Sequence, residues 1–85
     1  MRTKETTKVA ETILGKEISR LRGKLGISQE ELGFRADLHR TYISQLERGM
    51  KSPTLGVILK LSRILGTSAA KLVSNVERKV RQESP

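Results

Sequence analysis

Helix-starting and helix-stopping residues recur at short intervals along this 85-residue sequence, and they constrain its fold more than any other feature. Ser28 and Glu31 form a capping box, in which the serine hydroxyl accepts a hydrogen bond from a free backbone N–H and the glutamate reaches back. Gly26, Gly49 and Gly66 each follow a stretch with helical periodicity, and glycine commonly ends helices because it adopts positive φ without strain. The chain is therefore expected to fold as helices separated by tight turns.

Between these signals, apolar residues recur at the period of an α-helix, and no alternating run suits a β-strand. Thr54 and Ser68 stand where further helix caps are needed. Gly15 interrupts the first apolar stripe and is expected to weaken that helix. The predicted helices cover residues 9–24, 29–36, 39–48, 54–65 and 68–76.

Composition limits these helices to one aliphatic core. Hydrophobic residues make up 35% of the chain, with one Phe, one Tyr and no Trp, so the core must be built mainly from Leu, Ile, Val and Ala. A chain of this length fits one domain with a modest core. We expect an all-α fold, a compact five-helix bundle over residues 9–76, with a flexible basic arm at 1–8 and a polar tail at 77–85.

Several classes of function are disfavoured by what the sequence lacks. Without cysteine there is no disulfide, thiolate nucleophile or Cys-ligated zinc, and His39 is the single histidine, so no metal site is expected. No pair of catalytic carboxylates, activated nucleophile or phosphate-binding glycine loop can be assembled. The sequence therefore predicts a protein that is not an enzyme and needs no cofactor. It also shows no signal peptide and no run long enough to span a bilayer.

The charge balance points to a polyanionic partner. Seventeen Lys and Arg residues against nine Asp and Glu give a formal net charge of +8, which favours phosphate polymers or anionic membranes. Charge alone does not choose between them, since basic surfaces also keep small proteins in solution. A membrane-surface role is disfavoured because every apolar stripe has another helix against which it can be buried.

Residues 39–48 carry the most informative surface. Wound at 100° per residue, their hydrogen-bonding side chains share one side, called here the polar face: Arg40, Thr41, Ser44, Gln45 and Arg48. The opposite side is apolar. Two short helices joined by a tight turn, the second with a polar face, form a helix-turn-helix, whose second helix can read base edges in the DNA major groove. Taken alone, the same face could be an ordinary solvated helix surface.

The segments LRGKLGISQEEL, YISQLERG, SPTLGVILKLSRILG and SAAKL occur in an order and at a spacing that resemble the phage repressor and Cro-like helix-turn-helix family, also called XRE-like. The resemblance runs from Ile18 to Leu72, about two thirds of the chain. It implies a λ-repressor-like fold and a transcriptional regulator, specifically a repressor, that binds double-stranded DNA. Such a protein would be cytoplasmic and associated with the nucleoid.

The resemblance also implies a role for individual residues. Base reading is assigned to Arg40, Thr41, Ser44 and Gln45, and phosphate binding to Gln29, Arg48 and Lys51. Arg22 and Glu47 match a structural ion pair that joins the first helix to the third.

Four further positions carry expectations of their own. His39 is expected to cap the third helix, and Tyr42 to pack inward, with a hydroxyl–phosphate contact as the alternative. Asp37 stands where the family usually has a turn glycine, so it either adopts a left-handed conformation or alters the turn. Gly33 replaces a usual alanine, which keeps helices close but costs about 1 kcal/mol of helix propensity.

A single reading helix contacts too few base pairs for useful discrimination in a genome, so we expect a homodimer on an inverted-repeat operator with half-sites about 34 Å apart. No small-molecule ligand or membrane partner is expected. The apolar residues left for a dimer interface are Leu72, Val73 and Val76, with Val9 or Ile13. The alternative function is a protein-interaction module or antitoxin-type protein that binds a partner through the same scaffold.

Overall fold

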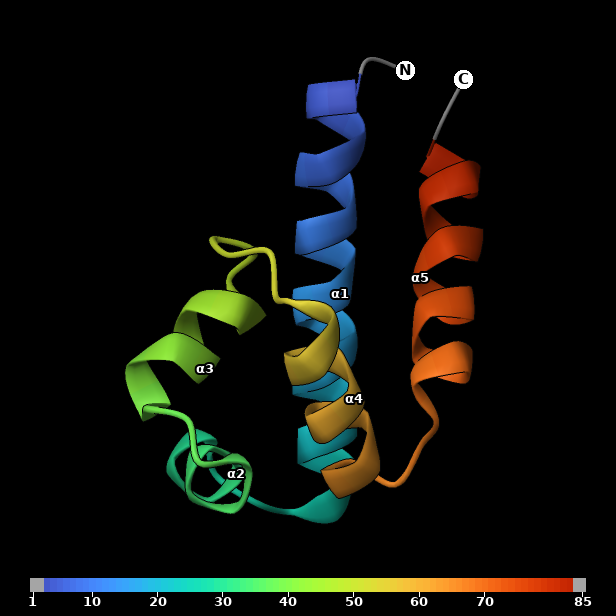
Figure 1. The fold of residues 1–85 in the computed structure, drawn as a ribbon. Coiled ribbons are helices and arrows are strands. Elements are labelled where there is room, and N and C mark those ends of the chain that lie inside the picture. Colours follow the sequence, from blue (N-terminus) through green and yellow to red (C-terminus); the bar gives the residue numbers. More distant parts are fainter. Residues whose placement is uncertain (1–2, 84–85) are drawn as a thin grey trace.

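The computed structural model describes residues 3–83 and folds them into five α-helices, as predicted (Figure 1). They are α1 (Thr3–Leu25), α2 (Gln29–Ala36), α3 (Arg40–Glu47), α4 (Leu55–Ile64) and α5 (Ala69–Glu83). Helices α1 and α5 lie side by side and run in opposite directions, while α2 and α3 pack together on the other side of α1 (Figure 1). Helix α4 contacts both α2 and α5, which closes the bundle.

The core is aliphatic and draws on all five helices. Each helix turns an apolar stripe inward, and the most deeply buried side chains are those of Ile18, Leu32, Ile43, Leu46, Leu61 and Leu72. Because these side chains come from elements far apart in sequence, the core fixes α2 and α3 against the long α1–α5 pair.

The helix ends follow the predicted signals. The hydroxyls of Ser28, Thr54 and Ser68 each accept a hydrogen bond from a backbone N–H three residues later, at 3.0, 3.3 and 3.0 Å. The reciprocal half of the predicted capping box is not formed. The carboxylate of Glu31 accepts instead from Nε of Arg35, one turn ahead, at 2.8 Å.

The outer ends of α1 and α5 differ from the prediction. Helix α1 begins at Thr3 and not at Val9, and α5 continues to Glu83 and does not stop near Val76. Val9 and Val80 are half-buried against the core, so the α1–α5 packing continues into stretches whose composition is mostly polar. Adding residues to an existing helix is far easier than nucleating one, which explains the extra turns. Residues 1–2 of the predicted arm and 84–85 of the predicted tail lie outside the described residues.

Gly15 was expected to weaken α1, but it has a packing role. It is buried, and a Cβ at this position would collide with the carbonyl oxygens of Leu46 and Glu47 at the end of α3. Glycine is therefore what lets the backbones of α1 and α3 approach so closely. This approach sets the position of α3 on the bundle.

Candidate nucleic-acid interface

The turn between α2 and α3 keeps its helix-turn-helix geometry although glycine is missing from it. Asp37 adopts the left-handed conformation at φ 55° and ψ 44°. The N–H of Leu38 donates to the carbonyl of Gly33 at 2.8 Å. A Cβ on Gly33 would stand 2.5 Å from the carbonyl oxygen of Leu38, so an alanine there would not fit without a shift. The two departures from the family pattern therefore lie next to each other, Gly33 in the last turn of α2 and Asp37 directly after it.

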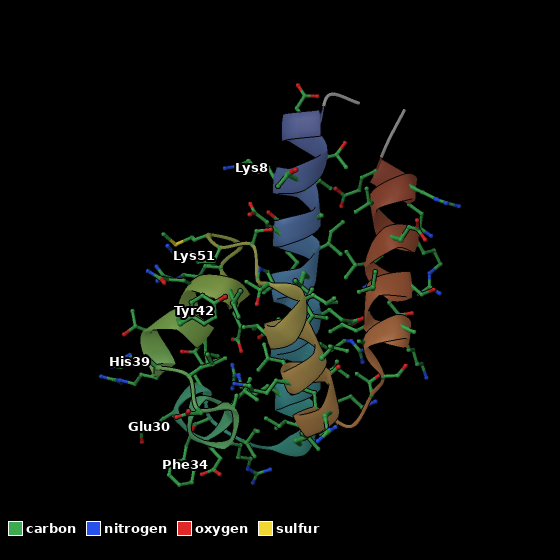
Figure 2. The ribbon with its side chains drawn as sticks, in the orientation of Figure 1. Lys8, Glu30, Phe34, His39, Tyr42 and Lys51 are labelled. Atoms are coloured by element: carbon green, nitrogen blue, oxygen red, sulfur yellow. The ribbon has the colours of Figure 1, made fainter. Side chains whose placement is uncertain are left out.

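His39 caps the start of α3. Its ring Nδ1 accepts a hydrogen bond from the backbone N–H of Thr41 at 3.0 Å, and its own backbone is extended. The cap satisfies one of the free N–H groups at the helix end, as predicted for this position. Figure 2 shows His39 at the start of α3.

The polar face of α3 points away from the core. Arg40 and Thr41 are exposed, while Ser44 and Gln45, nearer the bundle, are half-buried. The reverse side of the helix carries buried residues of the core, so the orientation of α3 is determined by packing. The structure thus brings the four predicted base-reading side chains together on one open surface.

Three residues at the margins of this face were also singled out by the sequence. Arg48 is exposed at the end of α3, where its Nε donates to the carbonyl of Ser44 at 3.4 Å. Lys51 is exposed in the following loop, on the same side of the molecule as His39 (Figure 2). Tyr42 is half-buried and packs against the core, which is the inward orientation that its place on the helix favours.

The predicted ion pair between Arg22 and Glu47 is present and bidentate. Nε of Arg22 lies 2.6 Å from Oε2 of Glu47, and Nη2 lies 2.9 Å from Oε1. The remaining guanidinium nitrogen donates to the carbonyl of Ile27 at 2.9 Å. Only 19% of the Arg22 side chain and 6% of the Glu47 side chain are exposed. The pair therefore fastens the end of α3 to α1 in a largely water-excluded place.

The electrostatics of this pair favour its charged form. Burial by itself would raise the pKa of Glu47, but hydrogen bonds from Arg22 and Gln29 outweigh it, and the pKa of the carboxyl lies below its usual range. The hydrogen bond to Glu47 raises the pKa of Arg22. Both groups are consequently ionised near neutral pH.

Gln29 was assigned to phosphate binding, and the structure shows an additional bond that the sequence did not predict. Its Nε2 donates to Oε1 of Glu47 at 3.0 Å. One carboxylate therefore connects α1, α2 and α3. The second hydrogen of the Gln29 amide is available for another acceptor at the start of α2.

Glu17 is a second buried carboxylate, and the sequence analysis did not single it out. Its side chain is 4% exposed and lies 2.5 Å from Nε of Arg20. The hydrogen bond from Arg20, opposed by burial, lowers the pKa of Glu17, and Lys79 and Asn75 on α5 lower it further. Its burial could have been predicted from the apolar residues of the first stripe that surround it in the sequence. This group stabilises the α1–α5 pair and lies apart from the polar face.

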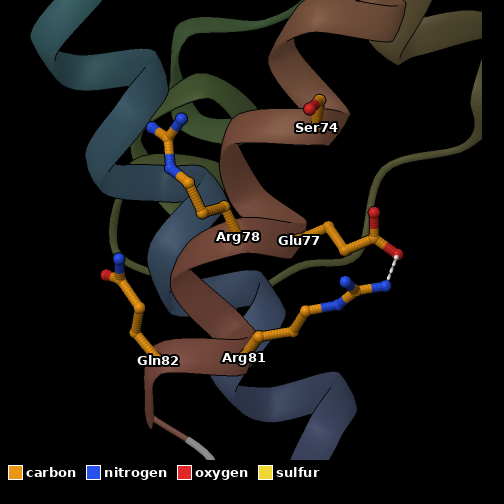
Figure 3. Close-up of a pocket in the computed structure, with 5 residues that line it drawn as sticks. All are labelled: Ser74, Glu77, Arg78, Arg81 and Gln82. Atoms are coloured by element: carbon orange, nitrogen blue, oxygen red, sulfur yellow. Dashed lines mark hydrogen bonds and ion pairs between the residues drawn. The ribbon is translucent and has the colours of Figure 1, made fainter.

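The described residues line several hollows on the surface. One lies on the outer side of α5 and is lined by Ser74, Glu77, Arg78, Arg81 and Gln82 (Figure 3). All five belong to one helix and are exposed, and the contact between Glu77 and Arg81 is 3.5 Å long. A hollow formed by a single helix cannot enclose a ligand.

Residues 3–83 contain neither a membrane-spanning helix nor a metal-binding cluster. No helix in that range combines the length and the apolar character needed to cross a bilayer. Within the same range, no group of three or more acidic or histidine side chains is arranged to hold a metal ion.

A short helix with an exposed polar face, held by a tight turn against a second helix, is the arrangement that defines helix-turn-helix proteins. The helix-turn-helix family model matches residues 18–72, and the chain belongs to this family, in its Cro-like or XRE branch. It is a DNA-binding transcriptional regulator and not an enzyme, as the sequence predicted.

Within the family, the chain is similar to controller proteins of restriction-modification systems. It is 40% identical to control protein C.BamHI of Bacillus amyloliquefaciens, over 79% of this chain and 90% of the relative. The crystal structure of the controller C.AhdI of Aeromonas hydrophila is 34% identical, with a TM-score of 0.72 over 76% of this chain and 94% of that one. The predicted fold is thereby confirmed.

A third comparison supports the fold alone. The controller C.Esp1396I is 24% identical and superimposes with a TM-score of 0.72, over 84% of this chain and 93% of that chain. Its structure is a tetramer in complex with its natural 35 base-pair operator.

Proposed function

We propose that this chain is a controller-type repressor that binds an inverted-repeat operator as a homodimer and places α3 in the major groove. The observation that carries the proposal is the construction of α3. Its polar face is open, its reverse side is buried, and its end is fastened to α1 by the Arg22–Glu47 pair. An α-helix presented in this way fits the width of the major groove of B-DNA.

The side chains on this face match the groups that base edges offer. Arg40 is exposed at the first turn and would donate two hydrogen bonds to O6 and N7 of guanine. Gln45 would bridge N6 and N7 of adenine, and Thr41 would contact a thymine methyl or a phosphate. Ser44 lies on the same stripe and would complete the readout with a short hydroxyl.

Phosphate contacts would flank the base contacts. Gln29 lies at the first turn of α2, where backbone N–H groups and the helix dipole favour an anion, and its amide retains one hydrogen for that purpose. Arg48 and Lys51 are exposed at the opposite end of α3. Contacts at both ends would hold the helix in register along the groove.

A dimer of this kind needs an interface, and the predicted interface has to be corrected. Leu72, Val76 and Ile13 are buried in the core of their own chain, so they are not available to a partner, whereas Val73 is 47% exposed and remains available. Leu55 and Leu59 are 70% and 53% exposed and stand one turn apart on α4. Burial of such side chains is the main source of free energy in association.

The position of α4 suits a two-fold axis. Helix α4 packs against α2 and α5, and the side of α4 that carries Leu55 and Leu59 is left exposed. Two chains joined through α4 could therefore present both copies of α3 to one face of a duplex. The tetramer formed by C.Esp1396I on its operator supports self-association in a controller of the same fold.

Similarity to C.BamHI supports a role in controlling the genes of a restriction-modification system, in the cytoplasm and together with the nucleoid. A dimer on an operator that overlaps a promoter would block transcription. The alternative function, partner binding without DNA reading, is opposed by the charge of α3, which carries Arg40 within its span and Arg48 directly after it.

Selection of bound sequences from random duplex DNA tests the proposal. We expect enrichment of one inverted repeat with half-sites about one helical turn apart. A Leu59→Asp variant should remain folded, lose the dimer in sedimentation analysis and bind single half-sites weakly. Absence of any enriched sequence would contradict DNA reading, while an enriched site without symmetry, bound by one chain, would contradict the dimer.

A further inference from the structure

One stripe of α1 lies against the C-terminal end of α3. At its lower end Arg22 pairs with Glu47, and two turns earlier Gly15 lies against the backbone at the end of α3. One turn further, Thr12 is the neighbour that a Cβ on Gly49 would meet, with 2.9 Å to its Cα. The α1 stripe therefore contacts the end of α3 and the glycine that follows it, from Leu46 to Gly49.

The next position on the same stripe is Lys8. With 3.6 residues per turn, a residue four positions before Thr12 leaves the helix on the same side. The carbonyl of Lys8 accepts a hydrogen bond from the hydroxyl of Thr12 at 3.1 Å, so the two residues occupy consecutive turns of intact helix. The stripe of α1 has passed the end of α3 at this position, and the Lys8 side chain is exposed.

The Lys8 side chain points to the same side of the molecule as that of Lys51, which is proposed to bind phosphate. Figure 2 shows the Lys8 and Lys51 side chains pointing to the same side of the molecule, the side on which α3 also lies. Among residues 3–83, the salt bridges of the structure do not include Lys8 or Lys51. Lys8 lines one hollow together with Glu5 and Glu83 but forms a salt bridge with neither. The ammonium groups of Lys8 and Lys51 thus lie near the end of α3 without a salt bridge to another described residue.

We infer that Lys8 binds a phosphate of the operator backbone on the flank of the half-site, beyond the contact made by Lys51. This inference rests on the proposed function and extends its binding surface. Because α1 is helical from Thr3, the ammonium group is presented by a rigid element and not by the flexible arm that the sequence suggested. The protein would therefore contact a longer stretch of the duplex than α3 alone contacts.

A salt titration measures this contact directly. Each phosphate neutralised on duplex DNA adds about 0.9 to the slope of log K against log salt. Loss of one contact should therefore lower the slope by about 0.9, which corresponds to about 3.5-fold less affinity lost between 50 and 200 mM salt. The effect should be equal on the selected operator and on random duplex, because phosphates carry no sequence information.

The test compares Lys8→Gln with Lys24→Gln in the full chain. Lys24 is also exposed on α1 but lies about 160° around the helix from Lys8, so the control has the same charge change on another side. We expect the lower slope only for Lys8→Gln, with unchanged melting temperatures for both variants. Ethylation interference should in addition show one flanking phosphate that matters for wild type and not for Lys8→Gln.

An unchanged slope for Lys8→Gln, or an equal loss for both variants, would overturn the inference. In that case wild type would still select an operator, so the proposed function would stand. If wild type selects no DNA at all, the proposed function and this inference fail together.

Discussion

Removal of the Glu47 carboxylate tests the ion pair that connects α1 to α3. The Glu47→Ala variant loses hydrogen bonds of 2.6 and 2.9 Å from Arg22 and one of 3.0 Å from Gln29. It leaves the Arg22 guanidinium without its partner in a site where 19% of its side chain meets solvent. Breaking a buried ion pair by removing one partner typically costs about 3 to 5 kcal/mol.

The expected magnitude is somewhat smaller here. Arg22 keeps its hydrogen bond to the carbonyl of Ile27 and reaches water at its exposed edge, so we expect a loss of about 2 to 4 kcal/mol in the free energy of unfolding. For a domain of this size, each kcal/mol changes the melting temperature by about 4 to 8 °C. Thermal denaturation followed by circular dichroism should therefore show a decrease of about 10 to 25 °C.

Two further variants serve as controls for this measurement. Glu77→Ala removes a carboxylate from the exposed pair with Arg81 and should cost less than about 0.5 kcal/mol. A double-mutant cycle with Arg22→Ala should give a coupling energy well above that of a surface pair. If Glu47→Ala melted within about 2 °C of wild type, like Glu77→Ala, the ion pair would contribute little. The stability of the α1–α3 contact would then have to come from apolar packing alone.

Three other outcomes follow from the same geometry. Arg40→Ala should cost about 1 to 3 kcal/mol on the selected operator and relax the preference at one base pair, whereas Lys51→Ala should weaken all sequences alike, as competition binding with single-base variants would reveal. Gly15→Ala should destabilise the fold by about 1 to 3 kcal/mol, because its Cβ meets the carbonyls at the end of α3. Gly23→Ala, with open space around its Cβ, should stabilise it by about 0.5 to 1 kcal/mol, and urea denaturation compares the two. Because the folded-state pKa of Glu17 is lowered, its contribution is present above the unfolded pKa of about 4.3 and is lost as pH falls through the folded value. Glu17→Gln should therefore melt at a temperature that falls less between pH 6 and pH 3 than that of wild type; an identical pH profile would contradict the assignment.

The central helices could be predicted from sequence because their ends are encoded locally. The predicted range of α2, Gln29–Ala36, is the observed one, since Ser28 begins it and the following turn ends it. The turn itself required the structure, because Asp37 can adopt either the left-handed or an ordinary conformation, and the local sequence does not decide between them.

What escaped prediction depends on contacts between distant segments. The outer turns of α1 and α5 are polar except for single residues such as Val9 and Val80, and their helical state follows from packing against each other. Likewise, the periodicity of α5 cannot tell whether Leu72 faces its own core or a partner chain. Only the assembled bundle shows that Leu72 is 1% exposed.

The exposed polar face of α3 also bears on how such regulators diversify. Arg40 and Thr41 lie outside the core, and surface substitutions of this kind usually change stability by less than about 0.5 kcal/mol. Under the proposed function, their exchange would therefore redirect the protein to another operator while folding remains intact. A few mutations at these positions could separate two copies of the gene into controllers that ignore each other's promoters.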